Sequence, residues 1–504
     1  MSGVGLLVAG TTSDAGKSVV TTALCRAFAR RGLRVAPYKA QNMSNNSMVT
    51  AEGAEIGRAQ WVQAVAACAE PEAAMNPVLL KPGSDRSSHV VVMGRSAGRL
   101  EAGEFAVGRQ HLARAAFDAF DDLRGRYDVV VCEGAGSPAE INLRAGDYVN
   151  LGLARHAGMP AVVVGDIDRG GVFAAFFGTV ALLEAADQAL VAGFVVNKFR
   201  GDVGLLRPGL VDLERMTGRR VYGVLPWIRD LWLDAEDALA LEERARPGGV
   251  GGMDGAVGDT LQVAVVRFPR ISNFTDVDAL AVEPGLAVRF VDDPRSLAGA
   301  DVVVLPGTRS TLADLEWLRQ RGLARAVADH VAAGGVVLGI CGGFQMLGRS
   351  ITDPDGVEGR PGAAVSALGL LEADTCFEAH KVVRLCSGEA LGAPASGYEI
   401  HHGRVTVSGG EAFLGGARRG RVFGTLWHGI FEADALRQAW LTEVARLRGA
   451  DGFKPGSASF AQLREERIDR LADTVEEHLD VDALLELARN GAPAGIRTVR
   501  DGMA

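Results

Sequence analysis

The chain has 504 residues, 48% of them hydrophobic, and its 53 lysines and arginines against 62 aspartates and glutamates give a net charge of −9. This length fits two large domains or about three of typical size, and the apolar fraction excludes wholesale disorder. The acidic balance disfavours nucleic acid as a partner, and no apolar run approaches the roughly 18 residues of a membrane-spanning helix. Six cysteines without a CxxC pair indicate a reducing cytoplasm and exclude a disulfide scaffold.

Short β-branched segments alternate with segments of helical period along both halves of the chain. In the first half we predict strands at residues 4–9, 128–132, 161–164 and 192–196, and helices at 18–31 and 179–190. In the second half we predict strands at 262–267, 301–305, 336–340 and 421–426. This alternation predicts an α/β fold in which crossover helices connect the strands of parallel sheets.

One low-complexity segment, the glycine-rich run at residues 247–258, separates the two halves and has the flexibility of a linker. Residues 457–489 are charged and amphipathic, with Ile468 and Leu471 among apolar positions at helical spacing, which predicts surface helices. We therefore predict a first domain at 1–235, a linker at 236–260, a second domain at 261–447, and a helical extension with a tail at 448–504.

The first predicted strand runs into a loop of sequence Gly-Thr-Thr-Ser-Asp-Ala-Gly-Lys-Ser, which ends at Ser18. A Walker A loop has four residues between its first Gly and the Gly-Lys pair, whereas this loop has five. Small residues let backbone N–H groups surround phosphate oxygens, and the following helix adds a positive dipole. We therefore predict a nucleotide-binding loop that includes Gly10, Thr12 and Gly16. In it, Lys17 reaches the β and γ phosphates and the Ser18 hydroxyl ligates Mg²⁺.

Two further polar residues follow predicted strands of the first half. Glu133 lies at the carboxyl end of a buried strand, where ligands bind in open α/β sheets, and we predict that it contributes to the Mg²⁺ site. Asn197 begins an Asn-Lys-Phe-Arg segment, which is similar to the guanine-reading Asn-Lys-x-Asp but has Arg200 where the carboxylate is needed. Asn197 can instead flank an adenine with Pro226, and a turn at the strand end explains it equally well.

The second half contains a strand, a sharp turn and a helix start around Cys341, in the sequence Ile-Cys-Gly-Gly-Phe-Gln. The adjacent glycines permit a strained turn, as in a nucleophile elbow, and the backbone N–H after Cys341 can serve an oxyanion hole. A thiol nucleophile needs a base, and His428, which follows a predicted strand, fits that role best among the nine histidines. These residues predict a catalytic pair of cysteine and histidine.

The first half resembles the dethiobiotin synthetase-like group of ATP-dependent carboxylate-activating enzymes in its loop spacing and its Glu-Gly-Ala-Gly strand end. Long polar blocks at residues 37–46, 55–60, 76–82, 136–142 and 166–173 are more specifically similar to the cobyric acid synthase family. Polar blocks without a period are poor core material, so we expect them to contact ligands. The resemblance implies that Lys39 neutralises an acyl phosphate and that Glu55 is a second acid beside Mg²⁺. It also implies a set of residues that contact the substrate, namely Gln41, Asn42, Ser44, Asp168 and Arg169.

The second half resembles class I glutamine amidotransferase domains. The resemblance implies that Gly307 belongs to the loop of the oxyanion hole, and that Gly307, Gly343 and Gln345 form part of the glutamine site. Two further blocks, at residues 269–278 and 397–401, are similar to the cobyric acid synthase branch.

One departure concerns the third member of a catalytic triad. Class I domains usually carry Glu two positions after the catalytic His, and Ile430 occupies that position here. The cobyric acid synthase branch is similar in lacking this Glu. The third member is therefore missing or supplied elsewhere, with Glu432 and Glu399 as candidates.

Together the resemblances imply two doubly wound α/β domains, the first P-loop NTPase-like and the second class I glutamine amidotransferase-like, with ATP and Mg²⁺ as cofactors. The implied reaction amidates the b, d, e and g carboxylates of a corrinoid, adenosylcobyrinic acid a,c-diamide. Glutamine is hydrolysed at Cys341, and its ammonia reacts with an acyl phosphate. Two alternatives stay open: cobyrinic acid a,c-diamide synthase, and a nucleotide switch with an inactive glutaminase domain. The oligomeric state also stays open, a homo-oligomer included.

Overall fold

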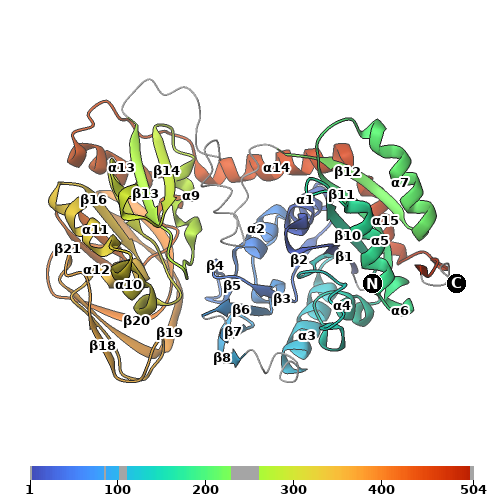
Figure 1. The fold of residues 1–504 in the computed structure, drawn as a ribbon, viewed down its shortest axis with the longest axis horizontal. Coiled ribbons are helices and arrows are strands. Elements are labelled where there is room, and N and C mark those ends of the chain that lie inside the picture. The colour runs from blue at the N-terminus through green and yellow to red at the C-terminus, as the bar shows by residue number, and fades with distance from the viewer. Residues whose placement is uncertain (1–2, 84–86, 102–109, 229–259, 500–504) are drawn as a thin grey trace.

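The computed structural model describes residues 3–83, 87–101, 110–228 and 260–499. The chain forms two lobes side by side, each built around a β-sheet with helices packed against it (Figure 1). The predicted linker at 236–260 lies outside the described residues, apart from residue 260. In the described part of the chain, no helix is both long and apolar enough to span a membrane.

The first lobe contains the predicted parallel sheet, which within the described ranges has six strands in the order β12-β11-β10-β1-β9-β2. Their bounds are Val4–Gly10 (β1), Val35–Tyr38 (β2), Val129–Glu133 (β9), Ala161–Asp166 (β10), Val191–Phe199 (β11) and Arg220–Pro226 (β12). The central strands are near-continuous apolar runs, because both faces of the sheet are buried. An apolar core on each face confirms the doubly wound architecture.

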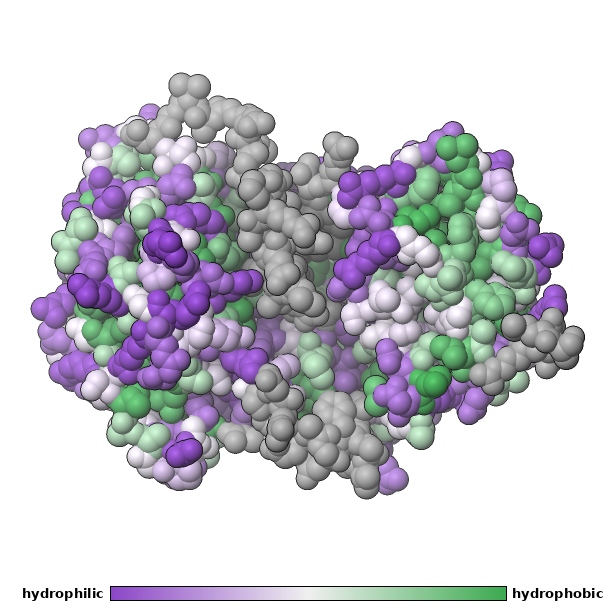
Figure 2. Space-filling view, viewed as in Figure 1, coloured by the Kyte–Doolittle hydropathy of each residue, from purple (hydrophilic) through white to green (hydrophobic). Residues whose placement is uncertain are grey.

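Helices on both faces connect these strands. Their bounds are Lys17–Arg30 (α1), Arg58–Ala66 (α2), Gln110–Arg126 (α3), Leu151–Ala157 (α4), Val172–Leu182 (α5), Ala185–Gln188 (α6) and Val203–Thr217 (α7). The prediction of one helix at 179–190 is wrong, because the buried Leu183 is extended and separates α5 from α6. Figure 2 shows hydrophobic surface over α7, where Leu205 and Val211 are exposed.

Two small sheets between β2 and α3 extend the first lobe toward the second (Figure 1). One has the order β3-β6-β7-β8 and the other pairs β4 with β5. Their bounds are Gln41–Met43 (β3), Ser47–Val49 (β4), Glu55–Gly57 (β5), Val78–Pro82 (β6), Ser87–Val92 (β7) and Arg95–Glu101 (β8). The polar blocks at residues 37–46, 55–60 and 76–82 therefore lie at the boundary between the lobes.

The second lobe is built on a sheet with the order β14-β13-β15-β16-β23-β22-β21, of which the first five strands are parallel. The strand bounds are Leu261–Val266 (β13), Leu286–Val291 (β14), Val302–Leu305 (β15), Val336–Ile340 (β16), Glu411–Phe413 (β21), Gly416–Arg419 (β22) and Val422–Thr425 (β23). The helix bounds are Asp278–Ala281 (α9), Thr311–Gln320 (α10), Leu323–Ala332 (α11), Gly342–Leu347 (α12) and Asp434–Arg448 (α13). Apolar cores cover both faces, as predicted for this half.

A further sheet of the second lobe has the order β18-β17-β19-β20. Its bounds are Ser350–Asp353 (β17), Ala363–Ser366 (β18), Ala373–Ala390 (β19) and Ala393–Val407 (β20). The long hairpin of β19 and β20 contacts β4 of the first lobe. This hairpin therefore brings residues of the second lobe to the boundary.

The C-terminal extension forms the predicted helices, Phe460–His478 (α14) and Val481–Asn490 (α15), but they are not simply surface helices. The helix α14 runs from the second lobe to the first (Figure 1). Its Phe460 belongs to the core of the second lobe, whereas Ile468 and Leu471 belong to a core of the first. The extension thus connects the lobes.

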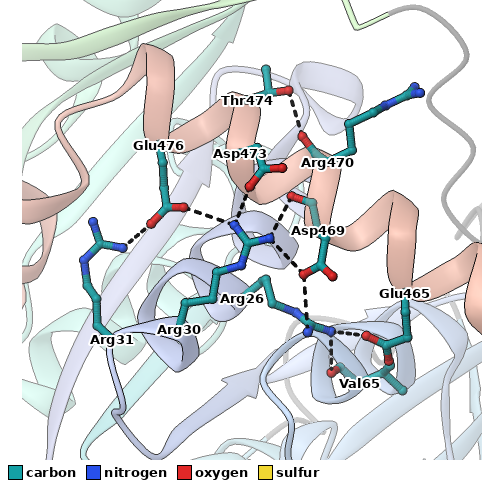
Figure 3. Close-up of polar contacts among 10 residues, drawn as sticks. All are labelled: Arg26, Arg30, Arg31, Val65, Glu465, Asp469, Arg470, Asp473, Thr474 and Glu476. Carbon is teal, nitrogen blue, oxygen red and sulfur yellow. Dashed lines mark hydrogen bonds and ion pairs between the residues drawn. The ribbon is translucent and has the colours of Figure 1, made fainter.

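Charged side chains line the contact of α14 with α1 (Figure 3). Arg30 pairs with Asp469 at 2.9 Å and with Asp473 at 2.6 Å, and Arg26 pairs with Glu465 at 2.5 Å. Exposed ion pairs contribute at most about 1 kcal/mol each, whereas each fully buried leucine or isoleucine contributes roughly 1.5–3 kcal/mol. Burial of the apolar face therefore dominates, and the ion pairs set the register of the two helices.

Candidate functional site

The glycine-rich loop between β1 and α1 surrounds the side chain of its own lysine. Lys17 Nζ donates to the carbonyl oxygen of Thr12 at 2.8 Å and to that of Gly136 at 3.1 Å. Gly16 has a φ of 101°, a value that favours glycine, and a Cβ there would overlap the side chain of Asn197. The loop therefore holds the ammonium group at the carboxyl end of the sheet, where ligands bind in this architecture.

Glu133 is the centre of a buried polar cluster beside the loop. Its Oε1 accepts hydrogen bonds from Ser18 Oγ at 2.8 Å and Lys39 Nζ at 2.9 Å, and its Oε2 accepts from Gln63 Nε2 at 2.5 Å. Burial opposes the charge of Glu133, but the Lys39 ammonium outweighs it and holds the pKa of this carboxyl below its usual range. Ser18 and an ionised Glu133 thus lie together.

Three other predicted residues lie near the loop in different roles. Asn197 braces it, because its Nδ2 donates to the carbonyl oxygen of Ala15 at 2.9 Å. Asp168 pairs with Arg200 at 3.1 Å, and Arg169 approaches Asp14 at 3.4 Å. None of the three lines the large cavity described next, so the structure does not bring Asp168 and Arg169 together with Lys39.

A cavity of about 970 Å³ opens beside Lys17 and Ser18. Lys39, Gln41 and Asn42, which were predicted to contact substrate, all line it, whereas Ser44 is buried and does not. On its far side the cavity is lined by residues of the second lobe, which are Arg267, Phe268, Pro269, Ile271, Asp292 and Trp317. The phosphate loop and the second lobe therefore face one shared space.

In the second lobe, Cys341 lies between β16 and α12 and has a φ of 50° and a ψ of −109°. This strained backbone is the geometry expected of a nucleophile elbow. Close packing explains why glycine is needed at Gly343 and Gly307, the two glycines predicted for the glutamine site. A Cβ at Gly343 would lie 1.9 Å from the carbonyl oxygen of Leu305, and one at Gly307 would lie 2.9 Å from the His428 ring.

His428 interacts with Cys341 on one side and with a carboxylate on the other. Its Nδ1 lies 2.7 Å from Oδ2 of Asp276, and the other oxygen of Asp276 accepts from the Gly429 N–H at 2.8 Å. Burial disfavours the imidazolium, but Asp276 and then Cys341 outweigh it and raise the pKa of His428 to about 10. Asp276 thus occupies the third position of a triad, which argues against an inactive glutaminase domain.

Neither residue that the sequence suggested as the third member of the triad, Glu432 or Glu399, occupies the position that Asp276 takes beside His428. Glu432 pairs with Arg58 of the first lobe at 2.7 Å and with Arg464 of α14 at 2.8 Å. Glu399 pairs with Arg384 at 2.7 Å. Both carboxylates are held by arginines, so the structure replaces these candidates with Asp276.

A small pocket of about 40 Å³ surrounds the thiol. Gln345 lines it, as predicted, and accepts from Thr311 Oγ1 at 3.2 Å. Sequence reasoning missed three charged residues of the same pocket, Arg309, Glu358 and Lys381. Burial raises the pKa of Glu358 to about 7, although the charge of Arg309 and hydrogen bonds from Thr311 oppose the rise. The pocket therefore places a guanidinium and a carboxyl group beside the thiol.

Glu55 lies at the boundary between the lobes and not beside the phosphate loop. Its Oε1 accepts from Lys81 Nζ at 2.6 Å, and its Oε2 pairs with Lys381 of the second lobe. Burial opposes ionisation of Glu55, but Lys381 and Lys81 outweigh it and hold its pKa far below the usual range. The structure therefore does not place Glu55 beside Ser18 and Glu133, which corrects the prediction of Glu55 as a second acid at the Mg²⁺ site.

Adjacent residues line the two cavities at this boundary. At the end of β6, Lys81 lines the thiol pocket and Pro82 lines the large cavity. In the second lobe, Ser272 lines the thiol pocket and Ile271 lines the large cavity. These two segments therefore form part of the wall between the two cavities.

The fold and the two cavities define an ATP-dependent amide ligase with its own glutaminase domain. Residues 6–239 match the family described as CobQ/CobB/MinD/ParA nucleotide binding domain, and residues 262–436 match the CobB/CobQ-like glutamine amidotransferase domain. A cobyric acid synthase of Mycolicibacterium vanbaalenii is 67% identical and covers 98% of each chain. A cobyric acid synthase of Mycobacterium ulcerans is 67% identical over 97% of this chain and 98% of its own. The chain belongs to the cobyric acid synthase family.

Proposed function

We propose that this chain amidates the b, d, e and g carboxylates of adenosylcobyrinic acid a,c-diamide. Family membership and the two matched domains make glutamine-dependent, ATP-driven amidation in cobalamin synthesis its activity. The choice of these four carboxylates rests on the family resemblance. We infer the residue roles from the geometry of the two cavities.

In the thiol pocket, Cys341 Sγ attacks the side-chain amide carbon of glutamine. His428 carries the proton between the thiol and the leaving nitrogen, and Asp276 holds the imidazole ring in place. Ammonia leaves, and water then hydrolyses the thioester to glutamate and restores the thiol. Arg309 and Glu358 match the α-carboxylate and α-ammonium groups of glutamine in charge.

In the large cavity, a substrate carboxylate oxygen attacks the γ-phosphorus of ATP, and the bond to the β-phosphate oxygen breaks to release ADP. The product is an acyl phosphate. Ammonia attacks its carbonyl carbon, and inorganic phosphate leaves as the amide forms. Lys17 and Lys39 line this cavity and stabilise the negative charge of the transferring phosphoryl group.

The donor set beside the loop fits Mg²⁺. A hydroxyl and one carboxylate suffice, because Mg²⁺ keeps waters and phosphate oxygens as its other ligands. Ser18 and Glu133 would hold the ion, which would neutralise phosphate charge. Among the described residues, no cluster of three or more His, Cys, Asp or Glu side chains suggests another metal site.

The observation that supports this function most strongly is that the two cavities share a wall. In the Lys81–Pro82 and Ile271–Ser272 segments of this wall, one residue lines the thiol pocket and its neighbour lines the large cavity, so ammonia released at the thiol forms next to the site that consumes it. Asn45 donates from Nδ2 to the carbonyl oxygen of Pro82 at 3.4 Å, and its buried Oδ1 has no hydrogen-bond partner within the described residues. An unpaired acceptor at this wall suits a small N–H donor in transit.

Replacement of Cys341 by Ala tests the division of labour. The variant is expected to lose amidation with glutamine and to retain it with ammonium salts, measured as corrinoid products by mass spectrometry. Lys17→Ala is expected to lose amidation with both nitrogen sources. Loss of ammonium-driven amidation in a folded Cys341→Ala protein would contradict the proposal.

A further inference from the structure

The large cavity has a polar end and an apolar part that the chemistry above does not use. The polar end is formed by Lys17, Ser18 and Lys39. Residues of the second lobe that carry no role in glutamine hydrolysis line the far side. Its volume of about 970 Å³ lies at the top of the roughly 300–1,000 Å³ range of small-molecule sites, so a large second substrate fits beside the nucleotide.

Aromatic rings form the wall on the second lobe. Phe268 is buried and its ring meets that of Trp317 edge-on, with centroids 6.2 Å apart and an interplanar angle of 76°. This packing fixes Trp317, which comes from α10, at the cavity surface. A fixed aromatic wall suits a flat apolar ligand, because little side-chain entropy is lost on contact.

The first lobe offers large apolar side chains to the same space. Met43 is 44% exposed and Leu143 is 52% exposed, and both line the cavity. Exposed apolar side chains that cluster around one cavity indicate a binding site. Both lobes therefore contribute large apolar side chains to the cavity beyond its phosphate end.

A charged pair lies at the same wall of the second lobe. Arg267 Nη2 lies 2.7 Å from Asp292 Oδ2, and both side chains are about two-fifths exposed. Arg267 can donate N–H groups to a ligand carboxylate. Asp292 can accept hydrogen bonds from a ligand amide. A corrinoid a,c-diamide carries both kinds of group around an apolar macrocycle.

We propose that the glutaminase lobe forms part of the corrinoid site, with Trp317 against the face of the macrocycle and the Arg267–Asp292 pair against its peripheral carboxylates and amides. This inference rests on the proposed function. It assigns part of the specificity for the acceptor to the lobe that supplies nitrogen. The corrinoid is then held between the lobes, close to the wall that ammonia must pass.

The test measures binding of cobyrinic acid a,c-diamide to the full chain by equilibrium dialysis, for which the absorbance of the corrin provides the signal. Trp317→Ala is expected to raise the Kd about 10-fold or more and to raise the KM for the corrinoid with ammonium as nitrogen source. Leu143→Ser, on the opposite wall, is expected to act in the same direction. Glu316→Ala, an exposed neighbour on α10 that does not line the cavity, is the matched control and is expected to bind as the wild type does.

The outcomes separate the two proposals. A Trp317→Ala protein with wild-type melting temperature and unchanged Kd and KM overturns the inference. A wild-type protein that neither binds nor amidates the corrinoid overturns the proposed function instead. If Trp317→Ala does not fold, Arg267→Ala decides, because Arg267 lies on the same wall of the second lobe and its side chain is about two-fifths exposed. An unchanged Kd in that variant overturns the inference.

Discussion

Asp276 Oδ2 lies 2.7 Å from His428 Nδ1, although 152 positions separate the two residues in the chain. The second oxygen of Asp276 also holds the backbone N–H of Gly429. One carboxylate therefore fixes both the ring and the turn that carries it. With Nδ1 occupied in this way, the other ring nitrogen is left for the thiol of Cys341.

We expect Asp276→Asn to impair glutamine hydrolysis without affecting the ligase. The amide can favour the wrong tautomer of His428, so kcat with glutamine is expected to fall by about 10²–10⁴-fold. Ammonium-driven amidation is expected to persist. The control is Glu399→Gln, which removes a rejected candidate and is expected to retain glutaminase activity. Glutamate release by Asp276→Asn at the wild-type rate would remove Asp276 from the triad.

The raised pKa of His428 predicts a pH-dependent contribution to stability. Its pKa is about 10 in the folded protein, against an ordinary value of 6.5. A group whose pKa rises on folding stabilises the folded state fully below its unfolded pKa, and this stabilisation is lost as pH rises through the folded pKa. The difference in melting temperature between wild type and His428→Gln is therefore expected to shrink from pH 6.5 to pH 10. A difference that stays constant over this window would contradict the assignment.

The strands and the two loops with catalytic roles could be predicted because their signals are local. A short apolar run followed by glycines specifies a strand and a turn within about ten residues, and both the loop before Ser18 and the elbow at Cys341 have this form. Asp276 was missed because its role depends on a contact across the fold. The available signal was the polar block at residues 269–278, which had no period and no assigned chemistry.

Long-range pairing also explains the other differences from the sequence predictions. Glu55 resembles a metal-site acid until the fold brings Lys81 and Lys381 to its two oxygens, and Lys381 is 326 positions away. The amphipathic pattern of the extension predicted helices correctly. The same pattern could not predict that α14 packs against α1, because the residues of α1 lie more than 400 positions earlier in the chain.

Lys381 is expected to keep ammonia within the enzyme. It lines the thiol pocket and pairs across the lobe boundary with Glu55. Burial lowers the pKa of Lys381 to about 8, although Glu55 opposes the shift, so the ammonium form depends on this partner. In Lys381→Met the boundary loses its ion pair, and we expect more than one glutamate to be released for each amide formed.

The measurement compares glutamate and corrinoid amide in the same reaction. Lys381→Arg keeps the charge and is the matched control, for which we expect one glutamate per amide. Ammonium-driven amidation by Lys381→Met is expected to match the wild type, because that reaction does not draw its ammonia from the thiol pocket. Tight coupling in Lys381→Met would show that the ion pair is not needed to retain ammonia.

The extension is expected to stabilise the first lobe mainly through its apolar face. Leu471 is buried against α1 and the sheet, so Leu471→Ala is expected to lower the free energy of unfolding by about 2–5 kcal/mol. Arg30 forms partly exposed ion pairs with Asp469, Asp473 and Glu476, so Arg30→Ala is expected to cost about 1 kcal/mol for each pair at most, and less at high salt. Urea unfolding of both variants at low and high salt measures these losses. A loss in Arg30→Ala as large as the loss in Leu471→Ala would contradict this division, because the ion pairs would then hold α14 on α1 as strongly as the apolar face does.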